Sequence, residues 1–199
     1  MNPMNRREML KLAAITPMAS ALTWTSVEAE QASLAAVAAR ADAAATGTAY
    51  RQQFFTPHEW RTVQVLADMV IPADERSGSA TDAGVPEFID FMMIDRPAMQ
   101  TAMRGGLGWM DAQCRERFGR DFVDCDDTQR GALLDDIAWP ARTPPGLSHG
   151  AAFFTGFRDL VATGFWSSRM GVEDLGYIGN VPNPAWDGCP PEQLRRLGL

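Results

Sequence analysis

The chain has few of the residues that build most catalytic and metal centres. It contains two histidines, His58 and His149, and three cysteines, Cys114, Cys125 and Cys189, with no CxxC pair among them. A zinc or iron–sulfur centre is therefore not expected. Neither histidine has a carboxylate or nucleophile at a suggestive spacing, and no serine elbow, Ser-x-x-Lys or paired-carboxylate signature stands out. The sequence thus predicts no catalytic, cofactor-binding or metal site in this chain.

Two longer patterns are also missing. No run of alternating apolar residues is long enough for a good strand, which predicts an all-α fold. Downstream of the N-terminus, nothing approaches the roughly twenty consecutive apolar residues of a membrane span. The formal net charge is -7, and such an acidic balance argues against nucleic acid and anionic lipid as partners.

Lysine occurs once, and its place is informative. Lys11 follows the Arg6-Arg7 pair and stands just before a short apolar run from Leu12 to Leu22. This arrangement is typical of a twin-arginine export signal, whose translocase carries folded proteins. We therefore expect a signal peptide at 1–29 and a mature protein in the periplasm or on the outer face of the inner membrane.

The residues after the signal divide into two parts. Cleavage is expected either at Ala19-Ser20-Ala21 or after Ala29, since both offer small residues. Residues 30–53 are alanine-rich without a firm apolar stripe, which indicates a spacer or a marginal helix. The folded domain is expected over 54–199, as an irregular bundle of about five helices with a long tail.

The first of these helices is the best determined by sequence. Thr56 is a suitable N-cap, a proline follows at the first helical position, and Glu59 completes a capping box. Phe55 and Trp60 have the spacing of a hydrophobic staple, and Pro72 ends the helix.

Apolar positions at helical spacing predict four more helices. They begin at Val85, run from near Pro97 to Arg117 and from Asp126 or Asp127 to Ala138, and begin near a Ser148 cap. Gly105, Gly106 and Gly108 interrupt the second of the four, which suggests a close helix crossing or a bend. Aspartates at 121, 124, 126 and 127 lack the pattern of a calcium loop, and helix-start acids explain them more simply.

The C-terminal part is expected to bind a partner. Residues 171–199 are rich in glycine and proline, yet they carry Tyr177, Ile178 and Trp186, so this irregular tail needs a surface to pack on. Trp139 and Trp166 lie at helix ends, where aromatic residues often anchor interfaces. The predicted interface is the tail together with the loop 143–149, and its candidate residues are His149, Trp166, Tyr177, Ile178 and Trp186.

The three cysteines allow three pairings in an oxidising compartment. A Cys114–Cys125 bridge is favoured because these residues flank a junction between two helices. A bridge from either residue to Cys189, which would pin the tail, is nearly as good.

Several segments resemble the gluconate 2-dehydrogenase subunit 3 family. They are FFTPHEW at 54–60, LADMVIPAD at 66–74, DAGVPEFID at 82–90, GFWSS at 164–168 and GYIGN at 176–180. The resemblance covers about 54–199, and its most specific part is the Ile71-Pro72-Ala73-Asp74 phrase followed by the turn at Ala83 to Val85.

The resemblance implies a small, helical, non-catalytic subunit of a periplasmic sugar or sugar-acid dehydrogenase. FAD and the catalytic bases would belong to a large partner of the glucose-methanol-choline type, and a multihaem cytochrome c with haem c would accept electrons. No catalytic residue carries over to this chain. The signal would carry the flavoprotein through export. Alternatives are a free-standing periplasmic enzyme or metal-binding helical protein, and an export chaperone that dissociates from its client.

Overall fold

The computed structural model describes residues 26–47, 50–177 and 188–198. These ranges contain eight α-helices and no β-strand, in agreement with the all-α prediction. Four short 3-10 helices connect or extend them: η2 (Pro97–Met99), η3 (Phe122–Asp124), η4 (Pro140–Arg142) and η5 (Pro145–Leu147).

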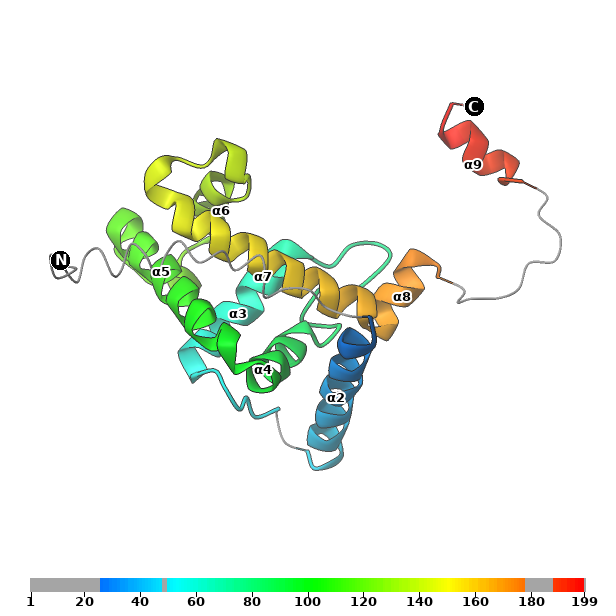
Figure 1. The fold of residues 1–199 in the computed structure, drawn as a ribbon, viewed down its shortest axis with the longest axis horizontal. Helices are drawn as coiled ribbons and strands as arrows, with labels where there is room; N and C mark the ends of the chain where they lie inside the picture. Colours follow the sequence, from blue (N-terminus) through cyan, green and yellow to red (C-terminus); the bar gives the residue numbers. More distant parts are fainter. Residues whose placement is uncertain (1–25, 48–49, 178–187, 199) are drawn as a thin grey trace, which may run out of the picture.

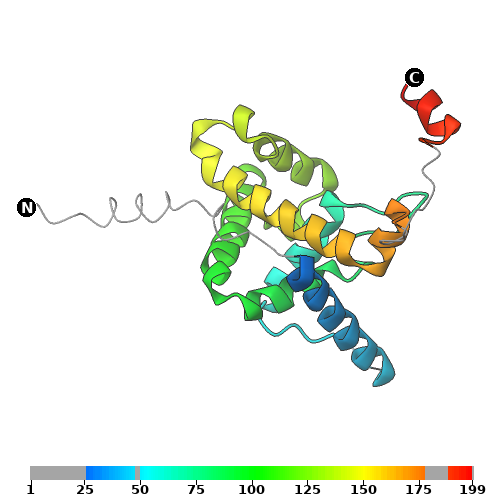
Figure 2. The same cartoon turned by 45° about the vertical axis from the view of Figure 1, so that its right-hand side comes forward.

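Helix α7 (Ser148–Ser167) is the central element of the bundle (Figure 1). Helices α5 (Gln100–Phe118) and α6 (Asp127–Ile137) lie near its N-terminal end, and α2 (Ser26–Ala45) lies near its C-terminal end (Figures 1 and 2). Helices α3 (Pro57–Val70) and α4 (Val85–Asp95) complete the body, and all six contribute to one apolar core.

The start of α3 is built as its sequence predicts. The Thr56 hydroxyl accepts a hydrogen bond from the Glu59 N–H at 3.3 Å, and the Glu59 carboxylate accepts one from the Thr56 N–H at 2.8 Å. The Phe55 and Trp60 ring centroids lie 6.4 Å apart, as a hydrophobic staple requires. Local capping therefore fixes this helix.

The other predicted helices are also present. Helix α4 begins at Val85, η2 and α5 together cover Pro97–Phe118, and α6 begins after an Asp126 N-cap that forms a capping box with Gln129. Helix α7 begins at Ser148 as expected, but the predicted Ser148 cap is wrong. Leu147 occupies the cap position, and no side chain bonds to the first turn.

Glycines bring α5 and α7 into close contact. The Phe153 ring of α7 lies against Gly106, where an added Cβ would overlap it, and the Trp109 ring of α5 lies against Gly150 in the same way. Each helix thus supplies a glycine for an aromatic ring of the other. This confirms the close crossing expected from the glycines of α5, although Gly105 and Gly108 face open space.

The alanine-rich segment is a larger part of the fold than its sequence suggests. Helix α2 spans Ser26–Ala45 and packs on α4 and α7 through Ala29, Ala32 and Ala36, which are at most 7% exposed. The folded body therefore begins before Phe54, and much of the expected spacer is helix. Ala29, one of the two candidate cleavage positions, lies inside α2, whereas Ala21 precedes the described residues.

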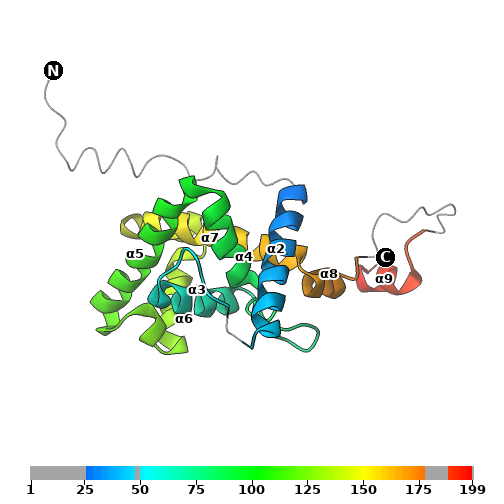
Figure 3. The ribbon, with the colours of Figure 1, turned by 90° about the horizontal axis from the view of Figure 1, so that it is seen from below.

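The C-terminal tail is also less irregular than expected. Residues Arg169–Leu175 form α8 and residues Pro191–Arg196 form α9. Helix α8 packs on the end of α7 through the buried Gly171. Helix α9 lies apart from the body (Figures 1 and 3), and none of its residues belongs to the core.

No helix among the described residues is both long enough and apolar enough to span a membrane.

Candidate partner-binding surface

The predicted interface residues do not form one patch. His149 lies in the first turn of α7 and is exposed, whereas Trp166 lies in the last turn and is 39% exposed. Seventeen residues of helix separate them by about 26 Å. Tyr177, 59% exposed, follows α8 and therefore belongs to the Trp166 end. Ile178 and Trp186, like the export motif Arg6, Arg7 and Lys11, lie outside the described residues.

Each end of α7 presents a large exposed aromatic side chain. Trp139, which follows α6, is 63% exposed and leads into the proline-rich segment containing η4 and η5. Trp166 packs edge-on against the buried Phe165 ring, with 4.9 Å between centroids. Exposed aromatics of this kind are enriched at protein interfaces. Trp139 is thus a stronger interface candidate than its helix-end position alone indicates.

The cysteines fall into two classes. Cys114 and Cys125 are buried free thiols whose side chains contact each other, and Cys189 is exposed. Burial, reinforced by the hydrogen bond with Cys125, raises the pKa of Cys114 to about 12. The pair favoured by the sequence analysis is thus brought together by α5 and the residue that follows η3, and both cysteines are free.

His58 has a partner that the sequence analysis did not find. Its Nε2 lies 2.7 Å from the Asp111 carboxylate on α5, and the other Asp111 oxygen accepts a hydrogen bond from the Phe122 N–H at 3.0 Å. The sequence analysis found no carboxylate at a suggestive spacing from His58, because Asp111 is near it only in the folded chain. Fifty-three residues separate the pair along the chain, so no local spacing could have predicted it.

The same histidine belongs to a cluster that could in principle hold a cation. Ligand atoms of His58, Asp111 and Asp121 lie within 4.8 Å of one another. Both Asp111 oxygens are already engaged, however, and Asp121 pairs with Arg115 at 2.6 Å. The described contacts make this cluster a cross-link between α3, α5 and η3.

Asp90 of α4 anchors the segment that leads into α3. Its buried carboxylate accepts hydrogen bonds from the N–H groups of Gln53, Phe54 and Phe55 at 2.7–3.2 Å, and from the Tyr50 hydroxyl at 2.9 Å. Burial, the Asp90 contact and the nearby carboxylate charges raise the pKa of Tyr50 well above its usual value. Asp90 is fully paired and therefore structural.

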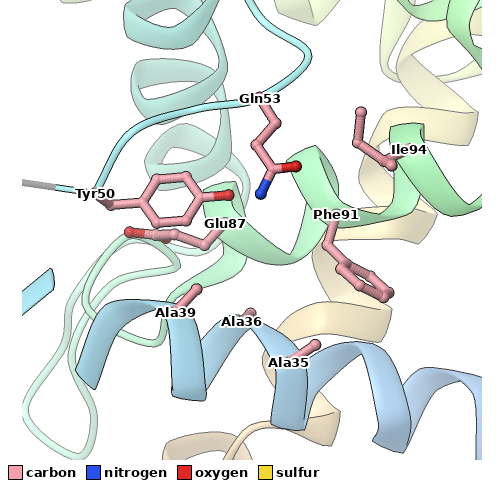
Figure 4. A pocket seen from close by; sticks show the side chains of 8 residues that line it. All are labelled: Ala35, Ala36, Ala39, Tyr50, Gln53, Glu87, Phe91 and Ile94. Atoms are coloured by element: carbon pink, nitrogen blue, oxygen red, sulfur yellow. The ribbon is translucent and has the colours of Figure 1, made fainter. Parts of the chain in front are cut away.

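A cavity of about 230 Å³ lies beside this anchor, between α2, α4 and the segment at 50–53 (Figure 4). Its lining residues are Ala35, Ala36, Ala39, Tyr50, Gln53, Glu87, Phe91 and Ile94. Glu87 is 8% exposed, and its Oε2 atom has no hydrogen-bond partner. Burial raises the pKa of Glu87. A hydrogen bond with its own backbone and the positive charge of Arg40 lower this pKa, but burial is the larger effect.

These features describe a small all-α protein whose polar clusters hold its helices together and whose exposed aromatics suit the binding of another protein. Comparison with protein families places it more closely. The family model for gluconate 2-dehydrogenase subunit 3 matches residues 57–185, more than half of the chain, and the chain belongs to that family. Comparison with curated proteins and with solved structures gave no match. Membership of this family is consistent with the chain being an accessory subunit of a dehydrogenase complex and not the catalytic chain of that complex.

Proposed function

We propose that this protein is the small, non-catalytic subunit of a periplasmic FAD-dependent dehydrogenase that oxidises a sugar or a sugar acid. The observation that carries the proposal is the family match over residues 57–185. The large subunit, of the glucose-methanol-choline type, holds FAD and the catalytic bases, and a cytochrome c with haem c accepts the electrons. The small subunit stabilises the flavoprotein and brings it to the twin-arginine translocase.

The export role rests on the N-terminal motif. Arg6, Arg7 and Lys11 stand ahead of a short apolar run, and a pathway for folded cargo suits a partner that must acquire FAD in the cytoplasm. The packed helix α2 supports this role as well. A signal that ends at Ala21 would stand four residues before α2, which begins at Ser26 and contributes to the core.

The interface is proposed at the C-terminal end of α7, continuing into the tail. Trp166, Leu175 and Tyr177 are 39%, 61% and 59% exposed there. Docking of the partner would bury this apolar surface, and burial contributes a favourable free energy of about 25 cal/mol per Å² of apolar area. Leu194 of α9 is half-buried and Leu197, which follows α9, is exposed, so this segment adds apolar area that its own body does not cover. Trp139 and His149, at the opposite end of α7, form a second candidate contact.

Co-expression with the large flavoprotein subunit tests the proposal. The two chains should co-purify with bound FAD, and the large subunit alone should be less soluble and remain in the cytoplasm. Replacing Arg6 and Arg7 by lysine in the small subunit should leave both chains in the cytoplasm. Normal export of the flavoprotein with that variant would exclude co-export, and turnover or bound flavin in the isolated small subunit would exclude the accessory role.

Truncation after Ser168 tests the interface. Loss of the complex, with circular dichroism unchanged apart from the missing helices, is the expected result. Persistence of the complex at full affinity would exclude the tail as the main contact. If the complex forms during export and separates afterwards, sedimentation of the periplasmic fraction will show two free chains, as for a dissociating chaperone.

A further inference from the structure

The cavity between α2 and α4 combines an incompletely paired charged group, Glu87, with apolar and aromatic walls. Ala35, Ala36 and Ala39 form its floor on α2, while Tyr50 and Phe91 stand on the opposite side (Figure 4). The Gln53 side chain reaches toward the cavity from the segment at 50–53 in the same view. A carboxylate and an amide are thus set among hydrocarbon surfaces.

Glu87 is the group that the chain leaves incompletely paired. Its Oε1 lies 3.6 Å from the Arg40 Nε, beyond hydrogen-bond range, and its Oε2 has no partner. Arg40 donates its closer bond, at 3.0 Å, to the carbonyl oxygen of Asp82. A buried carboxylate oxygen without a donor is costly, since its desolvation is not compensated. Because Oε2 is itself covered by neighbouring atoms, a cation in the cavity would supply that donor once the Glu87 side chain turns toward it.

The volume limits what can enter. Pockets for drug-sized ligands measure about 300–1,000 Å³, and the cavity, at about 230 Å³, is smaller. It is therefore too small for a flavin or a haem. Its mostly hydrocarbon walls do not suit a sugar, whose many hydroxyl groups need many partners. A single long side chain is the better match.

The chemistry of the walls selects among side chains. A guanidinium group is planar, stacks on aromatic rings and forms paired hydrogen bonds with carboxylates. Tyr50 and Phe91 supply rings, Glu87 supplies the carboxylate, and the alanines accommodate a hydrocarbon stem. An ammonium group, more strongly hydrated and without a planar face, would use the rings less well.

Exposed apolar side chains at the edge of the cavity indicate that a cation bound there would be part of a protein. Ile94, which lines the cavity, is 45% exposed, and Phe91, which also lines it, is half-buried. Apolar side chains around a charged pocket would be covered by a docked surface but not by a small free cation. The net charge of -7 favours a cationic contact as well.

We infer that this cavity is an anchor pocket for one arginine side chain of the large dehydrogenase subunit. This inference rests on the proposed function for the identity of the partner, and on Glu87, Tyr50, Gln53 and Phe91 for the chemistry. Arginine residues buried at the centre of an interface often carry much of its binding energy, so the pocket adds a contact on the α2–α4 side, separate from the tail.

The first test uses a side-chain mimic and the full chain. Propylguanidinium should cause saturable NMR shifts at Tyr50, Gln53 and Phe91, and neutral propylurea should not. Glu87→Gln should weaken the affinity by at least about tenfold, because the charged acceptor is lost. Asp42→Asn, which removes the same charge from an exposed position on α2, should leave it unchanged.

Several results would overturn the chemistry of the pocket. They are the absence of saturable shifts, equal affinity in the Glu87→Gln variant, or equal binding of propylammonium. The first would mean that the space holds only water, and the last that the pocket does not select arginine.

The second test uses the complex with the flavoprotein subunit. Glu87→Gln should raise its dissociation constant on the order of tenfold. Ala39→Leu, which narrows the cavity and leaves the carboxylate in place, should weaken binding similarly, whereas Asp42→Asn should not. If both cavity variants bind as tightly as the natural chain, the pocket inference fails and the accessory function stands.

Two further outcomes separate this inference from the proposed function. If the natural chain forms no complex with any flavoprotein subunit, the proposed function fails, and the assignment of the occupant fails with it. If sedimentation shows a homodimer that Glu87→Gln dissociates, the pocket binds a second copy of this chain, which also overturns the assignment.

Discussion

The α5–α7 and α2–α4 contacts both place small residues against aromatic side chains, but only one of them is closed. Where α5 crosses α7, Phe153 and Trp109 fill the spaces above Gly106 and Gly150. Where α2 meets α4, three alanines leave a cavity of about 230 Å³ beside Tyr50 and Phe91. The first contact is completed by this chain alone. The second is open, which is why we propose that a partner completes it.

The two buried carboxylates of α4 show the same contrast at the level of single groups. Asp90 accepts four hydrogen bonds from the segment at 50–55, whereas Glu87, one turn earlier, keeps an oxygen without a partner. Both are less than 10% exposed. Burial alone therefore does not distinguish a structural carboxylate from a candidate binding group, but the number of satisfied acceptor positions does.

Removing the paired carboxylate should have the largest effect on stability. Asp90→Ala leaves three N–H groups and the Tyr50 hydroxyl without their acceptor, and we expect a loss of about 3–5 kcal/mol in the free energy of unfolding. Urea denaturation measures it. Asp95→Ala, at the exposed end of the same helix, should change stability by less than about 0.5 kcal/mol. Similar losses in both variants would contradict the role given to Asp90.

Adding a methyl group where α5 crosses α7 should have the second-largest effect on stability. The Cβ of Gly106→Ala overlaps the Phe153 ring, and overpacking of this kind costs about 1–3 kcal/mol. Gly105→Ala is a matched control one residue earlier, where nothing lies within 4 Å of the added methyl group. It should stabilise the helix by about 0.5–1 kcal/mol. A stabilising Gly106→Ala variant would show that α5 and α7 do not cross as closely as described.

The free energy of unfolding should depend on pH through Glu87, which lies at the α2–α4 contact. Burial raises the pKa of this carboxyl, and the charged or titratable groups Arg40, Asp90 and Tyr50 lie near it. As pH rises above the usual glutamate range, the unfolded chain loses this proton first, so the folded state is progressively destabilised until the raised pKa is passed.

Glu87→Gln removes that penalty. Its free energy of unfolding should exceed that of the natural chain by an amount that is smallest in acid, grows through the titration and then becomes constant. Chemical denaturation at a series of pH values measures this difference. A difference that shrinks with rising pH would mean that the folded state stabilises the charged form, and that the carboxylate is better paired than its contacts indicate.

Thiol labelling of the natural chain measures how accessible the two buried cysteines near the C-terminal end of α5 are to a reagent in solution. Burial and the high pKa of Cys114 keep its thiolate scarce, so Cys114 and Cys125 should react with iodoacetamide much more slowly than the exposed Cys189. Mass spectrometry counts the labels with time. If the exported protein forms the Cys114–Cys125 bridge suggested by the sequence, labelling after denaturation will stop at one site and the mass will be about 2 Da lower.

The elements that local chemistry specifies were the predictable ones. Helix α3 followed from its capping box, and α6 followed from its apolar spacing and the acids at its start, Asp126 and Asp127. The sequence of α2 predicts only a spacer or a marginal helix, because an alanine face gives almost no periodic signal. It is stable in the fold only because α4 and α7 cover that face.

The candidate surfaces were harder to predict because they, like the position of α2, depend on contacts between distant parts of the chain. Tyr177 and Trp166 could be picked out as aromatics near irregular segments, and the structure places both at one end of α7, but it puts His149 at the other. The His58–Asp111 pair, the Asp90 anchor and the Glu87 cavity all join residues far apart in the chain. No spacing in the sequence records such contacts.

By itself the sequence determined the all-α class, the starts of the central helices, and the resemblance that the family match confirms. These depend on caps, glycines, prolines and apolar spacing, which act over a few residues. Only the tertiary structure decided which carboxylates are paired, which aromatic residues stay exposed, and where a space is left open. Those properties depend on how distant helices meet, and packing of the whole chain sets that geometry.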